Sequence, residues 1–284
     1  MAVSDHSDLS GTSGCQHRIT GIVTTASSET PELISRALLI SKKINLPYIG
    51  RNNKGIKKLA KEYGVTGVIV VSAKRISFHL ENKEFFYHPG MAKLRIKEML
   101  KGKTDQMVKS MDICPGDAIL DCTLGLGSDA LVASYAAGPY GTVTGLESSL
   151  LIELLVREGL AEMRDEGETL MTRAAERITT LNSHHLEFLT NTPDGTYDTV
   201  YFDPMFRHCI KGSPYMDAMR PLTDHSPLNC LVLQEALRVC RKRVVVKEKK
   251  GSTEFTRLGI HRVDGGKYSP VAFGIIIKRG GGHG

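Results

Sequence analysis

One short run of the chain combines acidic residues, glycines and a helix start in a way that can bind a nucleoside. The run Asp117-Ala-Ile-Leu-Asp-Cys-Thr-Leu-Gly-Leu-Gly-Ser-Asp129 begins as an apolar strand, ends that strand at Asp121 and turns through Gly125 and Gly127 into a helix. The N–H groups of the helix start and the carboxylate at the strand end would then face one small cavity. The simpler alternative is a glycine turn that only lets the helix pack on the strand.

The glycine pattern by itself fits two cofactors. The string Gly125-Leu-Gly127-Ser-Asp-Ala130 satisfies the dinucleotide fingerprint, and Glu147 lies 20 residues after Gly127, where an acid that binds a ribose is expected. NAD therefore fits. Asp121 favours another ligand, because a carboxylate before the first glycine would repel a pyrophosphate and attract an ammonium or a sulfonium. S-adenosylmethionine (SAM) carries both cations and no phosphate.

A second group of residues follows the predicted strand Tyr197–Phe202. In an open α/β sheet ligands bind outside the carboxyl ends of the strands, so Asp203 and Asp121 should open onto the same crevice. A carboxylate and a backbone carbonyl that each accept one N–H would aim the lone pair of an exocyclic amine at a methyl donor, and Asp203 and Pro204 supply these acceptors. Phe206 offers a flat face for a planar base. Alternatively, Asp-Pro is only a strand-ending turn.

The composition predicts a soluble globular protein. Hydrophobic residues make up 41% of the 284 positions, charged residues 24%, and no apolar run approaches the ~20 residues of a membrane span. Residues 1–14 are polar, so we expect a flexible leader, no secretory signal and no membrane partner. The six cysteines form no C-x-x-C pair, which favours a cytoplasmic protein without a metal site. The net charge of +6 permits a polyanionic partner.

Alternating strand and helix patterns from Met111 onward predict a parallel sheet covered on both faces. The expected strands are Ala118–Asp121, Thr142–Leu146, Ile178–Asn182, Tyr197–Phe202, Arg243–Lys247, Leu258–Val263 and Val271–Lys278. The expected helices are Ser128–Ala136, with Ser128 as its cap, Leu150–Met163, Leu170–Arg177 and Asn229–Val239. The last two strands form a hairpin around the turn 264–267, which is the plan of Rossmann-like methyltransferases rather than of dehydrogenases.

The part of the chain before Met111 predicts a smaller α/β unit. Strands are expected at Ile19–Thr25, Gly67–Ser72 and Ile76–Leu80, and helices at Pro31–Lys43 and Lys54–Tyr63. The predicted organisation is a leader (1–14), an N-terminal α/β subdomain (15–88), a helical bridge (89–110) and a methyltransferase domain (111–284). Helical spacing in the bridge aligns Lys93, Lys97 and Lys101 in one stripe, which is either a solvated face or a phosphate-binding surface.

Several sequence segments together resemble the RsmJ family, whose members are SAM-dependent guanine-N2 methyltransferases of small-subunit ribosomal RNA. They are Asp121-Cys-Thr-Leu-Gly-Leu-Gly-Ser-Asp-Ala130, Leu146-Glu-Ser148, Val200-Tyr-Phe-Asp-Pro-Met-Phe206 and Arg243-Val-Val-Val-Lys247. The similarity runs from about Pro89 to Lys278. The resemblance implies cofactor contacts from Ser128, Asp129, Glu147, Ser148 and Asp203. It implies another contact after the third strand, where this chain has His184 and His185 in place of small hydroxyl residues.

The leading hypothesis is therefore a SAM-dependent methyltransferase that acts on an exocyclic amine of a base in ribosomal RNA or a ribosomal particle. Asp203, Pro204 and Phe206 would hold the amine, and Arg207, Lys211, Lys247 and the 93–101 stripe would contact phosphates, so that RNA binding weakens with salt. One alternative keeps SAM and changes the substrate to a small molecule or a protein. The other is a non-catalytic RNA-binding relative.

Overall fold

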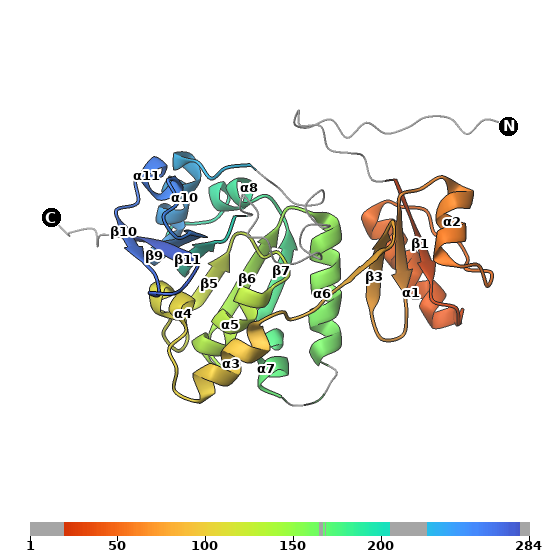
Figure 1. Ribbon diagram of the computed structural model, residues 1–284, viewed down its shortest axis with the longest axis horizontal. Coiled ribbons are helices and arrows are strands. Elements are labelled where there is room, and N and C mark those ends of the chain that lie inside the picture. Colours follow the sequence, from red (N-terminus) through yellow and green to blue (C-terminus); the bar gives the residue numbers. More distant parts are fainter. Residues whose placement is uncertain (1–19, 165–166, 168, 205–225, 279–284) are drawn as a thin grey trace.

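The structure is a computed structural model, and it describes residues 20–164, 167, 169–204 and 226–278. Within these residues two β-sheets form, one from the N-terminal part of the chain and a larger one from the remainder (Figure 1). Helix α6 (Leu150–Arg164) stands between them in the view of Figure 1.

The larger sheet has seven strands in the order β10-β11-β9-β8-β5-β6-β7. Their bounds are β5 Ala118–Asp121, β6 Thr142–Glu147, β7 Ile178–Asn182, β8 Tyr197–Phe202, β9 Cys240–Lys249, β10 Arg262–Asp264 and β11 Val271–Ile277. Strands β5 to β9 are parallel, whereas β11 runs antiparallel to β9 and to β10. The strand order reverses between β5 and β8, and ligands bind at such a switch point in open α/β sheets.

Helices cover both faces of this sheet. One layer contains α3 Ala92–Leu100, α4 Gln106–Met111, α5 Ser128–Ala137, α6 and α7 Leu170–Glu176, and the other contains α8 His185–Thr190, α10 Cys230–Val239 and α11 Glu254–Arg257. Successive strand residues point to opposite faces, so Tyr201 joins the core under the first layer while Val200 and Phe202 join the core under the second. Strands buried on both faces explain the continuous apolar runs in the sequence.

The N-terminal sheet has the strand order β1-β2-β3-β4. The strands are β1 Gly21–Thr25, β2 Gly67–Val71, β3 Ile76–Leu80 and β4 Lys83–Phe86, with helices α1 Pro31–Ile44 and α2 Ile56–Tyr63. Strands β1 and β2 are parallel, and β2, β3 and β4 are antiparallel neighbours. Thr30 caps α1 by accepting the N–H of Leu33 at 3.4 Å.

The two sheets share one hydrophobic core through α6. Buried side chains of the N-terminal unit and of α6 belong to the same hydrophobic cluster. At the edge of this contact Arg36 of α1 donates to Glu158 at 3.0 Å and to Glu162 at 3.1 Å. The absence of a side chain at Gly159 leaves room for Tyr87, because a Cβ on Gly159 would lie 2.1 Å from Tyr87 Cβ. The segment that leaves the N-terminal unit at Tyr87 is therefore closely packed against helix α6.

We expect Gly159→Ala to destabilise the protein by about 1–3 kcal/mol, because the new methyl group overlaps the ring and Cβ of Tyr87. Helix propensity alone would make Gly159→Ala more stable than the wild type, since alanine in a helix interior is favoured over glycine by about 1 kcal/mol. Urea unfolding of both proteins measures the difference in their free energies of unfolding. Ala161→Gly, on the exposed side of the same helix, is the control for propensity alone. A Gly159→Ala protein that is more stable than the wild type would contradict this packing.

The α/β fold class with a Rossmann-like sheet and a terminal antiparallel pair is confirmed, and β5, β7 and β8 have the predicted bounds. Two predictions were wrong, and one strand was missed. Gly127, in the left-handed conformation at φ 71°, precedes α5, so Ser128 is the first helical residue and not the cap. Of the predicted strand Leu258–Val263 only Arg262 and Val263 are extended, as part of β10, because the chain leaves α11 through a left-handed turn at Gly259. Strand β4 was not predicted, since two of its four residues are charged.

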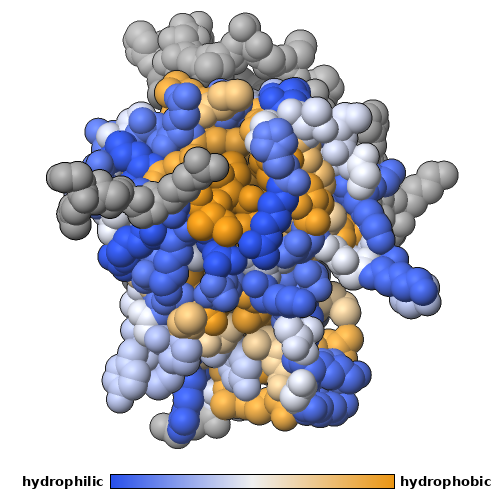
Figure 2. Space-filling view, turned by 90° about the vertical axis from the view of Figure 1, so that its left-hand side faces the viewer, coloured by the Kyte–Doolittle hydropathy of each residue, from blue (hydrophilic) through white to orange (hydrophobic). Residues whose placement is uncertain are grey.

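Figure 2 looks onto the end of the molecule where β9, β10 and β11 lie and shows an apolar patch bordered by hydrophilic side chains. Val263 of β10 and Ile277 of β11 are the large apolar residues of these two strands with exposed side chains. The edge strand β10 has only three residues, which leaves little unpaired backbone for another chain. Among the described residues we find no helix with the length and apolar character needed to cross a bilayer.

Candidate active site

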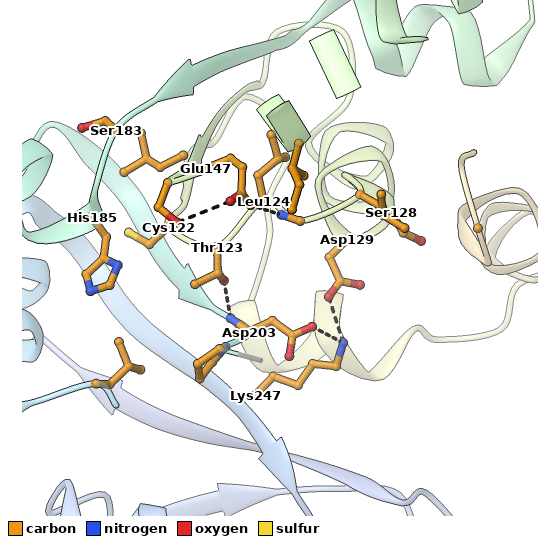
Figure 3. Close-up of a pocket in the computed structure, with 18 of the residues that line it drawn as sticks. Cys122, Thr123, Leu124, Ser128, Asp129, Glu147, Ser183, His185, Asp203 and Lys247 are labelled. Atoms are coloured by element: carbon orange, nitrogen blue, oxygen red, sulfur yellow. Dashed lines mark hydrogen bonds and ion pairs between the residues drawn. The ribbon is translucent and has the colours of Figure 1, made fainter. Parts of the chain in front are cut away.

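A cavity of about 410 Å³ opens at the carboxyl ends of β5, β6 and β8 (Figure 3). Its size is that of a small-molecule site. The lining includes the apolar residues Leu124, Leu126, Leu146, Ile152 and Leu228. It also includes charged side chains, and three of these, Asp129, Asp203 and Lys247, meet in one cluster (Figure 3). The cavity therefore offers both apolar surface and charged groups to a ligand.

The glycine turn after β5 is held by Glu147 at the end of β6. Glu147 Oε2 accepts the N–H of Gly125 at 3.1 Å, and Oε1 accepts the N–H of Ser149 at 2.8 Å. Gly125 has φ 50°, a left-handed conformation that favours glycine. Because both carboxylate oxygens accept backbone N–H groups, the side chain is fixed with its edge toward the cavity.

Asp121 has a different setting from the one predicted. Its side chain is 2% exposed and does not line the cavity; Oδ1 accepts the N–H of Thr123 at 3.0 Å. The pKa of Asp121 is raised to about 8: burial and the charges of Asp129 and Asp203 raise it, and the hydrogen bond from the Thr123 N–H and the charge of Lys247 only partly offset them. At neutral pH the group is mostly protonated. Asp121 thus fixes the turn from within the protein, and the carboxyl groups that line the cavity are those of Asp129, Glu147 and Asp203.

A chain of charged groups connects four elements at the cavity, namely α3, α5, β8 and β9. Lys247, from β9, donates to Asp203 Oδ2 at 2.8 Å and to Asp129 Oδ2 at 3.0 Å (Figure 3). Asp129, in the first turn of α5, also accepts from Arg95 of α3 and from the Tyr201 hydroxyl at 2.8 Å. Side chains this far apart in the sequence are brought together only by the fold.

The two carboxyl groups paired with Lys247 differ in charge state. Burial raises the pKa of Asp129, but Lys247 and Arg95 outweigh it and hold the pKa at about 2. Burial also raises the pKa of Asp203, and here Lys247 only partly offsets it in the presence of Asp129, so the pKa is about 6. Asp129 is therefore ionised at every physiological pH, whereas Asp203 gains a proton in mildly acidic solution.

Most of the predicted site residues line the cavity: Gly125, Ser128, Asp129, Glu147, Ser148, His185, Asp203 and Pro204. Gly127 and His184 lie outside the lining. Gly127 lets α5 approach α6, since a Cβ there would be 3.2 Å from Val156 Cγ1. His184 is the N-cap of α8, with Nδ1 accepting the N–H of Leu186 at 3.3 Å. Phe206, Arg207 and Lys211 lie outside the described residues.

The sequence interpretation missed one wall of the cavity. This wall consists of His88, from the end of the predicted N-terminal subdomain, and of Gly90, Met91 and Arg95, from the predicted helical bridge. Gly90 lies close to the start of α5, because a Cβ on it would be 3.5 Å from Ser128 Oγ. Lys247 was expected at an RNA phosphate and instead points into the site. A lysine at the carboxyl end of a buried strand was the signal available for it.

Comparison with known proteins agrees with this geometry. Residues 74–261 match the model of a protein family described as "Putative SAM-dependent methyltransferase". The chain belongs to this family. It is a SAM-dependent methyltransferase. The uncharacterized protein YpiP of Bacillus subtilis (strain 168) is 36% identical, over 84% of this chain and 93% of that protein.

One further relative of this methyltransferase and one solved structure of the same fold carry descriptive names. The ribosomal RNA small subunit methyltransferase J of Desulfotalea psychrophila is 26% identical, over 79% of this chain and 87% of the relative. The crystal structure of a SAM-dependent methyltransferase from Neisseria gonorrhoeae has the same fold, with a TM-score of 0.59 at 18% identity over 91% of this chain and 96% of that one.

The cavity of the methyltransferase fits SAM by the chemistry of its walls. The apolar lining residues suit an adenine ring, and Glu147 stands at the strand end where an acid can accept ribose hydroxyls. Asp129 and Asp203 are paired with the cations Arg95 and Lys247, so the charged cluster as a whole does not select between a sulfonium and a phosphate. The family match, together with the Glu147 carboxylate and the apolar lining, assigns SAM as the cofactor.

Proposed function

We propose that this methyltransferase transfers a methyl group to the exocyclic amine, N2, of a guanine in small-subunit ribosomal RNA. The observation that carries the proposal is the Asp203-Pro204 pair at the carboxyl end of β8, which lines the cavity beside the charged cluster. The names of relatives such as that of Desulfotalea psychrophila support ribosomal RNA as the substrate class.

In this proposal Asp203 and the Pro204 carbonyl each accept one N–H of the amine and thereby aim its lone pair into the cavity. Bound SAM would supply an electrophilic methyl group, with the electron pair of the broken S–CH3 bond left on its sulfur, so that S-adenosylhomocysteine is the product. The amine nitrogen carries one proton too many after it gains that methyl group, and Asp203 accepts this proton. Glu147, Gly125, Ser128, Asp129, Ser148 and His185 hold the cofactor, and Phe206 stacks on the base.

Exposed basic side chains near the cavity support a polyanionic substrate. Lys93 and Lys97 of α3 are exposed, and the same helix begins beside Met91, which lines the cavity and is 59% exposed. Lys101 is instead paired with Glu98 at 2.8 Å. Lys93 and Lys97 therefore offer contacts to phosphates that approach the cavity mouth.

Deletion of the gene should remove one methylated guanosine from small-subunit ribosomal RNA, and a plasmid copy should restore it. Mass spectrometry of nucleosides from the purified RNA of both strains measures this. An unchanged set of methylated nucleosides in the deletion strain would exclude ribosomal RNA as the substrate. The cofactor assignment would then point to a small molecule or a protein as methyl acceptor.

A further inference from the structure

The ammonium group of Lys247 lies between the carboxylates of Asp129 and Asp203. It is 3.0 Å from Asp129 Oδ2 and 2.8 Å from Asp203 Oδ2 (Figure 3). The Lys247 side chain is only 20% exposed. Charge-assisted hydrogen bonds are short and strong where little water competes for them, so this cation fixes the positions of both carboxylates.

Asp129 is held independently of Lys247, so it can serve as an anchor. Its Oδ1 accepts from Arg95 Nη1, and its Oδ2 accepts from Tyr201 Oη at 2.8 Å. Arg95 in turn donates to both oxygens of Asp105, at 2.8 Å and 2.9 Å. Helix α3, strand β8 and helix α5 thus all fix the carboxylate on which the lysine rests.

Asp203 is held at its backbone and at one carboxylate oxygen. Its N–H donates to Thr123 Oγ1 at 2.5 Å, and Oδ2 accepts from Lys247. Within the described part of the chain, Oδ1 has no hydrogen-bond partner. One oxygen is thus engaged, and the other is available to a ligand in the cavity.

We propose that Lys247 is a positioning residue for methyl transfer: anchored on Asp129, it fixes one oxygen of Asp203, keeps the carboxylate ionised and leaves the other oxygen to accept an N–H of the substrate amine. The inference rests on the proposed function of Asp203. Lys247 itself touches neither the amine nor the methyl group. A lysine whose ammonium did not interact with the Asp203 carboxylate would leave the proton affinity of Asp203 unaffected.

The charges around Asp203 predict the direction in which its pKa changes when Lys247 is removed. The titratable groups that face it in the described residues are Lys247, Asp129, Glu248, Asp121 and Tyr201. Lys247 is the cation among them, and it lowers the pKa that burial raises. An opposite charge within 4–6 Å changes a carboxyl pKa by about 1–3 units, so removal of Lys247 should raise the pKa of Asp203 by such an amount. A protonated Asp203 at neutral pH would donate a hydrogen bond where the amine needs an acceptor.

The test is a ¹³C NMR titration of the cofactor-free full-length protein labelled at the aspartate carboxyl carbons, with the Asp203 signal assigned from Asp203→Asn. The wild-type midpoint should lie near pH 6. In Lys247→Met it should move upward by about 1–3 pH units. Lys249→Met, an exposed lysine on the same strand, is the matched control and should leave the midpoint in place. Lys247→Arg, which keeps the cation, should restore most of the wild-type value.

An Asp203 midpoint in folded Lys247→Met that equals the wild-type midpoint would overturn the proposal. If Lys247→Met does not fold, as judged by circular dichroism, Lys247→Gln provides the same comparison. The titration uses no RNA and no SAM. A wild-type protein that transfers no methyl group to ribosomal RNA would therefore contradict the proposed function, while the titration would still decide the part of Lys247.

Discussion

Asp203→Asn should lower the rate of methyl transfer to small-subunit ribosomal RNA by about 10³-fold, and SAM affinity should fall by less than tenfold. The asparagine has the size of the aspartate but carries no charge, so it cannot take the proton that the methylated amine releases. Lys247 would lose one of its two carboxylate partners. Transfer of labelled methyl groups from SAM gives the rate, and calorimetric titration with SAM gives the affinity.

Asp194→Asn is the matched control, because Asp194 is an exposed aspartate that pairs with Arg238 and does not line the cavity. It should transfer methyl groups at the wild-type rate. Full activity in Asp203→Asn would show that Asp203 performs no chemistry. The transfer site would then have to lie elsewhere in the cavity, or the acceptor would have to bind without this carboxylate.

Glu147→Ala should weaken SAM binding by about 10- to 100-fold. Hydrogen bonds to a charged group contribute about 1.5–3 kcal/mol, and each 1.4 kcal/mol is a factor of ten in affinity. The substitution removes the acceptor for the ribose hydroxyls and also releases the N–H groups of Gly125 and Ser149. Calorimetric titration with SAM and with S-adenosylhomocysteine should show the same loss, since both ligands carry the ribose.

The control for this change is Glu187→Ala on α8, an exposed glutamate outside the cavity lining, which should bind SAM as the wild type does. Unchanged SAM affinity in Glu147→Ala would assign Glu147 to the support of the glycine turn alone. Glu147 also holds the backbone N–H groups of Gly125 and Ser149 without cofactor. The loss of SAM affinity must therefore be measured on Glu147→Ala protein that unfolds cooperatively on heating.

The fold was predictable from local patterns because the sheet is buried on both faces. Strands β6 and β8 end where their buried residues end, and the acids at the ends of such strands identified Glu147 and Asp203 as cavity residues. The short strand β4, with two charged residues among its four, lacks this pattern. Its place is set by pairing with β3, a tertiary contact that no local pattern contains.

The charged cluster of the site was not predictable in the same way. Lys247 and Asp129 are 118 positions apart, and Arg95 and Asp129 are 34 apart. In the sequence Arg95 looks like one more base of a solvated helix, and Lys247 like the end of a strand. Their roles depend on which helix face is buried and on what lies across the sheet. Asp121 shows the converse, because its position was predicted but its burial and its protonation were not.

The most direct test of the account uses SAM with a ¹³C- and deuterium-labelled methyl group. The purified protein is incubated with small ribosomal subunits, and separately with naked ribosomal RNA, from a strain that lacks the gene, and the RNA is digested to nucleosides for mass spectrometry. The account predicts that the label appears in N2-methylguanosine and that Asp203→Asn does not place it there. Label in another nucleoside, or no label in RNA while SAM is bound, would contradict it.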